Sequence, residues 1–415
     1  MNVYAKRRAK VLEQMRDNSL LVLYSGVALP RSMDSTLSFE ANTHFFYLTG
    51  LRRENMALVL RKTSQTTEAI FTEEPVLQAE RWTGRRLRTE EVQACSGIET
   101  VLWTHELGAY LSRILAREEV DAVYFDCYRN SDELAETYNA AKAKAFSDAY
   151  PGIRVRNAHP MIAKLRMVKD AHEIALLRQA LAVTDVGLRR VLHQLAPGQR
   201  EYQAQAEFEY AIRMEGAESV AFPTIAGSGL NGCMLHYVQN DAVFEKDTLL
   251  LMDLGARWNG YCADITRTYP VSGRYSERQK QYYDLVLRAN REVAQCARPG
   301  ITLRELNDRC KHVLAQGLIA LGKITTPEEI VQYYMHGVSH HLGIDVHDAA
   351  VDENAPLAPG MVITDEPGLY IDDEAIGIRI EDDLLITEEG CLVLSQSIPR
   401  ETGEIEALMG ESRAE

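Results

Sequence analysis

Residues 249–268 read LLLMDLGARWNGYCADITRT, in which an Asn-Gly pair separates two strand-like runs. Asn-Gly in this position is a strong signal for a β-hairpin with a two-residue turn. If Asn259 and Gly260 form the turn, Asp253 faces Thr266 across the hairpin, and Asp264 is its diagonal neighbour on the same face. Asp253 also follows four apolar residues, which is unusual for a surface acid. The hairpin therefore predicts two carboxylates within joint reach of a small ion.

Three further motifs rich in polar groups follow this hairpin. Residues 335–348 read MHGVSHHLGIDVHD, and four of the chain's eleven histidines lie within twelve of these residues. Such a density is typical of metal or proton chemistry. The other two motifs read TDEPGLY at 364–370 and GIRIEDD at 377–383. In the last motif the alternation predicts that Glu381 belongs to a strand and faces the same side as Arg379.

One histidine and four carboxylates from these motifs form an oxygen-rich set of candidate ligands: Asp253, Asp264, His340, Glu366 and Glu381. Such a set suits hard or borderline divalent ions such as Mn²⁺, Co²⁺ or Zn²⁺ and differs from a thiolate site. Four carboxylates carry enough negative charge to neutralise two divalent cations. Two ions roughly 3.5–4 Å apart can share a hydroxide and clamp a tetrahedral intermediate, as in aminopeptidases.

Two pairs of helices flank these motifs along the chain. The first pair begins at Asp170, with Glu173 at capping-box spacing, breaks at Pro197-Gly198 and ends near Gly216. The second pair begins at Ser276, breaks at Pro299-Gly300 and restarts at Thr302, where Glu305 completes a second box. Each pair leads into a β-rich stretch. The pattern suggests an internal duplication of a helix–helix–sheet unit, whose halves would share one cleft.

The first 160 residues differ from the rest of the chain. Short apolar runs at 20–24, 57–60 and 122–125 are of the buried-strand type, and helical patterns occupy 107–117 and 132–150. This alternation indicates an α/β domain with a largely covered sheet. The pattern changes near Pro151-Gly152 and His159-Pro160. We therefore predict one domain over 1–160 and a second over 161–415.

Composition excludes several classes of partner. The formal net charge is −15, so the chain should repel nucleic acid and anionic membranes. No apolar run approaches the roughly 18 residues that span a bilayer. The seven cysteines are dispersed without C-x-x-C spacing, which argues against a disulfide framework. A polar segment interrupts any signal-peptide pattern at the N-terminus. We expect a cytoplasmic protein without nucleic-acid or membrane partners.

The five candidate ligands, each in its local sequence, resemble the metal-binding motifs of the "pita-bread" metallopeptidases. Within that group the chain is similar to aminopeptidase P, the Xaa-Pro aminopeptidases, with Xaa-Pro dipeptidase (prolidase) as close kin. Residues 38–50, SFEANTHFFYLTG, resemble the N-terminal domain signature of aminopeptidase P, and 227–236 resemble a catalytic-domain motif. The resemblance covers nearly the whole chain. It implies an α/β N-terminal domain plus an α+β pita-bread catalytic domain built from the duplicated unit.

The same resemblance implies a role for each ligand. Asp253 and Glu381 would bridge or chelate two divalent ions, for which we expect Mn²⁺ ahead of Co²⁺ or Zn²⁺. Asp264 would bind one ion and His340 the other. Glu366 would span both ions and shuttle the proton of the attacking water.

Five more residues match family positions around the ligands. His236 and His347 match histidines that line the cleft and stabilise the tetrahedral intermediate or the substrate's proline carbonyl. His336, Tyr370 and Arg379 match outer positions, where an arginine can hold a carboxylate by charge-assisted hydrogen bonds.

Some residues depart from the family pattern. His44 replaces an Asp thought to pair with the arginine, and His341 replaces a residue that is often Trp or apolar. Asp365 precedes Glu366 where an apolar residue is common, and on a strand it should face away from the metals. No arginine occurs between Asp348 and Pro359, where prolidases and some aminopeptidases P carry one that contacts the substrate. None of these departures removes one of the five candidate ligands. They therefore concern the substrate specificity and not the class of reaction.

Three classes of function fit a pita-bread chain. A dinuclear metal-dependent exopeptidase would release the N-terminal residue from Xaa-Pro-Yaa peptides through a metal-bridging hydroxide. A non-catalytic binding protein, or a metal-free amidinohydrolase of the creatinase kind, would typically lack part of the ligand set, which is complete here. The alternative within the first class is prolidase, which the N-terminal domain and the missing arginine disfavour. We expect a homodimer or homotetramer that acts on peptide substrates.

Overall fold

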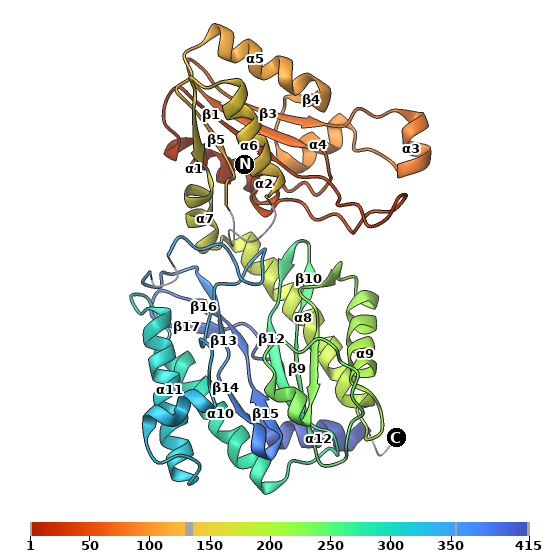
Figure 1. The fold of residues 1–415 in the computed structure, drawn as a ribbon, viewed down its shortest axis with the longest axis vertical. Coiled ribbons are helices and arrows are strands. Elements are labelled where there is room, and N and C mark those ends of the chain that lie inside the picture. The colour runs from red at the N-terminus through yellow and green to blue at the C-terminus, as the bar shows by residue number, and fades with distance from the viewer. Residues whose placement is uncertain (1, 129–135, 353–354, 413–415) are drawn as a thin grey trace. The chain divides into compact units, whose positions relative to one another are not determined.

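The computed structural model describes residues 2–128, 136–352 and 355–412 (Figure 1). The chain divides into two compact units, residues 1–166 and 167–415. From the sequence we had placed the boundary at residue 160. The two units are described separately below.

The first unit is built on a six-stranded sheet with the strand order β4-β3-β2-β1-β5-β6. Its strands are β1 (Ser19–Tyr24), β2 (Ala57–Lys62), β3 (Thr66–Thr72), β4 (Val101–Trp103), β5 (Ala122–Phe125) and β6 (Arg154–Asn157). Its helices are α1 (Val3–Gln14), α2 (Thr43–Thr49), α3 (Leu77–Thr83), α4 (Thr89–Ser96), η1 (Thr104–Glu106), α5 (Leu107–Arg117), α6 (Tyr138–Ala149) and α7 (His159–Met167).

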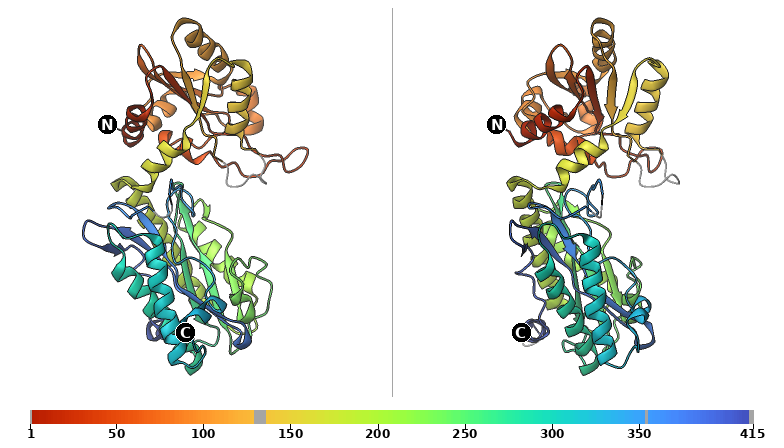
Figure 2. Two further views of the ribbon diagram at one scale, coloured as in Figure 1. Left: turned by 60° about the vertical axis from the view of Figure 1, so that its left-hand side comes forward. Right: turned by 90° about the vertical axis from the view of Figure 1, so that its left-hand side faces the viewer.

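Helices cover both faces of this sheet (Figure 2). Side chains of α5 and α6 pack on the face that carries Leu20 and Val22 of the central strand β1. Leu21 and Leu23 point to the opposite face, and all four leucine and valine side chains are fully buried. A strand buried on both faces reads as a continuous apolar run, which is why these strands were recognisable in the sequence.

The second unit contains two helix pairs, each followed by β-strands. The first half comprises α8 (Ala171–Gln194), α9 (Glu201–Met214), β7 (Ser219–Val220), β8 (Ile225–Ser228), η2 (Gly229–Cys233), β9 (Leu249–Leu254), β10 (Ala256–Trp258), β11 (Tyr261–Cys262) and β12 (Ile265–Pro270). The second half comprises α10 (Glu277–Cys296), α11 (Leu303–Ala320), η3 (Pro327–Gln332), β13 (Val362–Asp365), β14 (Gly368–Ile371), η4 (Asp372–Glu374), β15 (Ile376–Arg379), β16 (Asp382–Ile386), β17 (Cys391–Val393) and α12 (Thr402–Ser412).

This arrangement confirms the duplicated helix–helix–sheet unit. The strands pair in the orders β12-β9-β8 and β11-β10-β7 in the first half, and β13-β16-β17 and β14-β15 in the second. In Figure 1 the helices flank the strands on both sides. The predicted capping boxes are also present, since Asp170, Ser276 and Thr302 each accept a hydrogen bond from the backbone three residues ahead.

The central hairpin has the register expected from its turn. Asp253 pairs with Thr266 across the β9–β12 ladder, and Trp258 pairs with Tyr261 next to the turn. Asn259 and Gly260 both have positive φ, 46° and 84°, as a two-residue type I′ turn requires. Between the two ladders, a Cβ at Gly255 would lie 1.7 Å from the carbonyl oxygen of Ala263. Only glycine fits at this close approach between the chain after β9 and Ala263, the residue before Asp264.

Pro160, near which the sequence pattern changes, lies in the first turn of helix α7, where its missing N–H costs no hydrogen bond. One sequence prediction was wrong in detail. Glu381 does not belong to a strand, because β15 ends at Arg379 and β16 begins at Asp382. Of the helix predicted over 132–150, residues 138–149 form α6, and the part before residue 136 lies outside the described residues.

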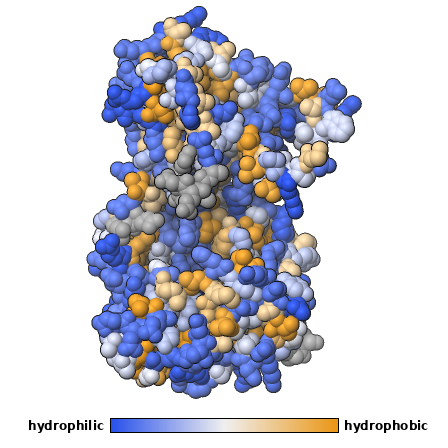
Figure 3. Space-filling model, viewed as in Figure 1, coloured by the Kyte–Doolittle hydropathy of each residue, from blue (hydrophilic) through white to orange (hydrophobic). Residues whose placement is uncertain are grey.

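The surface is largely polar with scattered apolar side chains (Figure 3). Among the described residues, no helix combines the length and the apolar character needed to cross a bilayer.

Candidate active site

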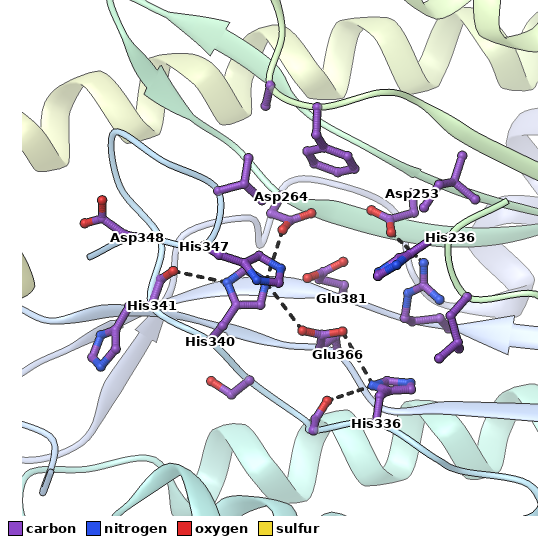
Figure 4. Close-up of a pocket in the computed structure, with 18 of the residues that line it drawn as sticks. His236, Asp253, Asp264, His336, His340, His341, His347, Asp348, Glu366 and Glu381 are labelled. Atoms are coloured by element: carbon purple, nitrogen blue, oxygen red, sulfur yellow. Dashed lines mark hydrogen bonds and ion pairs between the residues drawn. The ribbon is translucent and has the colours of Figure 1, made fainter. Parts of the chain in front are cut away.

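A cavity of about 900 Å³ in the second unit collects the polar motifs (Figure 4). All five predicted ligands line it, together with four other predicted site residues: His236, His336, His347 and Arg379. Tyr370 is fully buried behind them and is connected by hydrogen bonds. The structure therefore brings together side chains that are up to 145 positions apart in the sequence, from His236 to Glu381.

Both halves of the duplicated unit contribute ligands at strand ends. Asp253 lies near the end of β9, and Asp264 lies between β11 and β12. Glu366 follows β13, and Glu381 lies between β15 and β16, where its N–H donates to the carbonyl of Thr266 at 3.0 Å. That hydrogen bond ties the second half to the central hairpin. Although Glu381 is outside a strand, it lines the same cavity as Arg379, as the alternation predicted.

The candidate ligand atoms converge on a small volume. One ligand atom from each of Asp264, His340 and Glu381 lies within 4.8 Å of the others. Nε2 of His340 is 3.4 Å from Oδ2 of Asp264 and 3.5 Å from Oε1 of Glu366. In Figure 4 these side chains point toward one another from opposite sides of the cavity.

His340 has the orientation of a metal ligand. Its Nδ1 lies 3.1 Å from the carbonyl oxygen of His341, and a carbonyl can only accept a hydrogen bond. Nδ1 therefore carries the proton, and the lone pair of Nε2 faces the carboxylates. A ligating imidazole is usually fixed in this way by a bond from its other nitrogen.

The carboxylates repel one another in the absence of a cation. Burial raises the pKa of Asp264 and of Glu381 well above the usual range, and neighbouring acids, Asp253 among them, raise both further. Burial also raises the pKa of Glu366. Oδ1 of Asp253 is buried without a hydrogen-bond partner among the described residues. Four acids, one correctly oriented imidazole and one unused carboxylate oxygen fit divalent cations well.

An arginine holds one of these acids from behind. Arg379 donates from Nη2 to Oδ2 of Asp253 at 2.6 Å and from Nε to the hydroxyl of Thr266 at 3.0 Å. The Thr266 hydroxyl in turn donates to Oε2 of Glu381 at 2.7 Å. These bonds fix two candidate ligands relative to each other, which second-layer groups commonly do around metals.

The same arginine orients a tyrosine and a histidine. Arg379 Nη1 donates to the Tyr370 hydroxyl at 2.9 Å, and that hydroxyl lies 2.8 Å from Nε2 of His336. Nδ1 of His336 donates to the carbonyl of Gly337, so Nε2 accepts from the tyrosine. Burial lowers the pKa of His336 to about 4, which keeps the ring neutral near pH 7.

His347 and His236 lie on the cavity wall away from this network. The His347 ring lies against the His340 ring with centroids 4.1 Å apart, and burial lowers the pKa of His347 to about 4. The His236 side chain is exposed to the cavity from the opposite side (Figure 4). Their roles toward a substrate stay predictions.

Comparison with known proteins agrees with this geometry. Residues 175–388 match the model of metallopeptidase family M24, and residues 4–124 match that of the aminopeptidase P N-terminal domain. The chain belongs to metallopeptidase family M24. The M24 match covers the whole ligand set, and the second match covers most of the first unit.

Several relatives of this M24 chain extend over its full length. The Xaa-Pro aminopeptidase of Haemophilus influenzae is 34% identical, covering 98% of this chain and 96% of the relative. The low-pH form of Escherichia coli aminopeptidase P superposes with a TM-score of 0.92 at 32% identity, covering 100% of this chain and 99% of that one. A Bacillus anthracis protein solved as a candidate aminopeptidase P gives a TM-score of 0.97 at 39% identity, with 99% and 98% covered. The resemblance seen in the sequence is confirmed, and the chain is a metal-dependent exopeptidase.

Sequence reasoning missed two features of the M24 site. The cavity has an apolar wall formed by Ala221, Phe222, Pro223 and Ile225, a run without polar chemistry to mark it. Asp348, which follows His347 and lines the cavity, forms a buried ion pair with Lys169 at 3.0 Å. Both side chains are at most 1% exposed. Because 179 positions separate the two, no local pattern could have shown this pair.

A second group of possible ligands occurs in the first unit, where His44, Asp126 and His159 bring ligand atoms within 4.8 Å. Arg166 lies 3.0 Å from Nδ1 of His44, and a guanidinium can only donate. Nε2 of His44 therefore carries the hydrogen and donates to Nδ1 of His159 at 2.9 Å. A cation would have to break this bond beside a buried arginine, so we assign no metal here.

The other departures from the family pattern lie behind the ligands. The His341 side chain is 3% exposed and points away from the carboxylates in Figure 4; burial lowers its pKa to about 4. The Asp365 side chain is fully buried and is absent from the cavity lining, and burial raises its pKa well above the usual range.

Proposed function

We propose that this peptidase releases the N-terminal residue from peptides whose second residue is proline, and that it prefers peptides longer than two residues. The convergence of Asp264, His340 and Glu381, with Glu366 3.5 Å from His340, is the observation that carries the proposal. The full-length relatives named as Xaa-Pro aminopeptidases support the choice of substrate.

We infer that the site holds two divalent cations, with Mn²⁺ ahead of Co²⁺ or Zn²⁺. Asp253, Asp264, His340, Glu366 and Glu381 would hold them. A zinc-substituted form of E. coli aminopeptidase P has been solved with product, which supports a site of borderline character in that relative. When bound, the cations would supply Lewis acidity, which polarises a carbonyl and lowers the pKa of water.

Glu366 is the group that would accept and return a proton. Its carboxylate lies in the cavity next to His340, and a carboxylate in that place can accept a proton in one step and return it in the next. It would take the proton from the attacking water and pass it to the leaving proline nitrogen.

The two wall histidines would act on the proline side of the substrate. His347 is neutral because its pKa is about 4, so its ring N–H can donate a hydrogen bond to a carbonyl oxygen. His236 projects into the cavity from another segment. The apolar part of the cavity lining, Phe222 and Ile225 included, suits the apolar proline ring.

Proline in second position explains why a metal site suits this substrate. The Xaa-Pro amide has no N–H and a fixed φ, so proteases that pair with an extended strand cannot hold it. Catalysis at a metal centre needs only the carbonyl oxygen and a nearby free amine. An amine held by a carboxylate would limit cleavage to the first bond.

We also propose a cytoplasmic location and a homo-oligomeric assembly. All seven cysteines are free in the structure, which supports a reducing compartment such as the cytoplasm. We keep the homodimer or homotetramer as a proposal, which light scattering of the purified protein would test.

The experiment that tests the substrate class compares a dipeptide with a tripeptide. Purified protein with Mn²⁺ is given Xaa-Pro and Xaa-Pro-Yaa, and the released Xaa is measured. We expect the tripeptide to be cleaved faster. If the dipeptide were cleaved far faster, prolidase would be the better description; cleavage of neither would contradict the proposal.

A further inference from the structure

His236 differs from His336 and His340 in how its side chain is held. It lies on the segment between η2 and β9, and the side chain is exposed. Among the described residues it has no hydrogen-bond partner, in contrast to His336 and His340. Its place in the cavity therefore depends on the backbone of its own segment.

That segment is attached to one buried carboxylate. Glu201 begins helix α9, and its side chain is fully buried. Oε1 accepts from the N–H and the hydroxyl of Ser228, at 2.7 and 2.8 Å, and from the Asn231 amide at 3.1 Å. Oε2 accepts from the Tyr237 hydroxyl at 2.8 Å and from the N–H of Ala242 at 2.9 Å.

These bonds hold the chain on both sides of His236. Ser228, the last residue of β8, and Asn231 of η2 come before it, whereas Tyr237 and Ala242 follow it on the segment itself. Tyr237 is adjacent to His236 and 6% exposed. Burial raises the pKa of Tyr237 to about 12, so the hydroxyl remains a donor to Glu201 at neutral pH.

A buried carboxylate with this many donors is a strong and specific anchor. Burying a charge is costly unless hydrogen bonds satisfy it, and here each oxygen accepts from at least two groups. Glutamine in its place would keep one acceptor oxygen and would present an amide N–H₂ to groups that are themselves donors. The attachment would loosen at the oxygen that is lost, without removal of any cavity residue.

We propose that Glu201 is the positioning residue for His236, which acts on the substrate; this rests on the proposed function. Glu201 is absent from the cavity lining, so any effect on turnover must pass through the segment that it holds. A displacement of about 1 Å in a catalytic group can cost on the order of 10²-fold in rate.

The test is a double-mutant cycle with Glu201→Gln, His236→Ala and the double variant, assayed on an Xaa-Pro-Yaa tripeptide with Mn²⁺. We expect Glu201→Gln to lower kcat/KM by roughly 10- to 100-fold, the scale of a small misplacement, with bound metal unchanged. In the His236→Ala background the same change should cost less than about threefold, because coupled sites are not additive. Equal losses in both backgrounds would overturn the proposal.

Two further variants separate positioning from a loss of folding. Glu173→Gln is the matched control, since Glu173 is also a buried glutamate in the first turn of a helix, α8, but accepts from Asp170 and Tyr261. It should leave kcat/KM within about threefold. If Glu201→Gln fails to fold, Tyr237→Phe removes only the hydroxyl donor next to His236. The loss of kcat/KM that Tyr237→Phe causes should then be smaller in the His236→Ala background than in the wild type. Equal losses in the two backgrounds would overturn the proposal.

One readout does not depend on the substrate. The ring signals of His236 can be assigned in histidine NMR spectra by their loss in His236→Ala. Glu201→Gln, or Tyr237→Phe in its place, should shift or broaden these signals while those of His347 stay unchanged. Unmoved His236 signals would overturn the positioning role even if the wild-type protein failed to cleave Xaa-Pro peptides, an outcome that would contradict only the proposed function.

Discussion

The side chain of Thr266 connects Arg379 to Glu381 directly opposite Asp253 in the β9–β12 ladder. Its hydroxyl accepts from Nε of Arg379 at 3.0 Å and donates to Glu381 at 2.7 Å. Arg379 also holds Asp253 at 2.6 Å. One residue of the first half therefore aligns two candidate ligands from different halves, and its position follows from the hairpin register.

Replacing Asp264 by Ala should weaken or empty one metal position. The side chain is 4% exposed and supplies one of the three converging ligand atoms. We expect bound Mn²⁺, measured by elemental analysis, to fall toward one ion per chain, with loss of most activity. A fully active variant that keeps two ions would contradict the assignment of Asp264.

His347→Ala should keep the metal and lose turnover. The ring lies against His340, but its nitrogen is not part of the converging ligand group. We expect kcat to fall by roughly 10²–10⁴-fold, as for a positioned acid, base or electrophile. Loss of metal from this variant would show that His347 is a ligand.

Lys169→Met should destabilise the second unit. It leaves Asp348 buried without its cation, which costs about 3–5 kcal/mol. The matched control is Lys144→Met, because both side chains of the Lys144–Asp148 pair are 67% exposed. Losing that pair should lower the free energy of unfolding by less than about 1 kcal/mol. Denaturant unfolding measures both, and adding Asp348→Asn should restore part of the loss. Equal effects of the two lysine changes would refute this account.

The metal-free protein should lose stability as pH rises. Burial raises the folded-state pKa of Asp264 and Glu381 above that of the unfolded chain. The folded state therefore binds more protons, and its stability falls between the ordinary and the raised pKa values. Asp264→Asn removes one of these charges. It should raise the thermal midpoint of the chelator-treated protein at pH 8 but not that of the Mn²⁺-loaded protein; an unchanged midpoint without metal would contradict the repulsion.

Local sequence patterns predicted much of the fold and the set of candidate ligands. Asn259-Gly260 determines a turn and hence the pairing of Asp253 with Thr266, and capping residues such as Asp170 satisfy helix ends within three residues. These features depend on neighbours in the sequence, so they can be predicted from it. Glu381 was identified through its motif, although the end of β15 at Arg379 could not be foreseen from alternation alone.

Features that depend on distant partners could not be predicted. Lys169 and Asp348 meet only after the second unit has folded, and so do Glu201 and Tyr237. The partners of His44, His159 and Arg166, come from α7 and could not be identified from its own motif.

The dinuclear site requires two metal ions between five side chains. Anomalous diffraction at the manganese absorption edge, from crystals grown with Mn²⁺, would show where the ions lie. We expect two peaks, both bounded by Asp253, Asp264, His340, Glu366 and Glu381. A single peak, no peak, or peaks only beside His44 and His159 would contradict the dinuclear site.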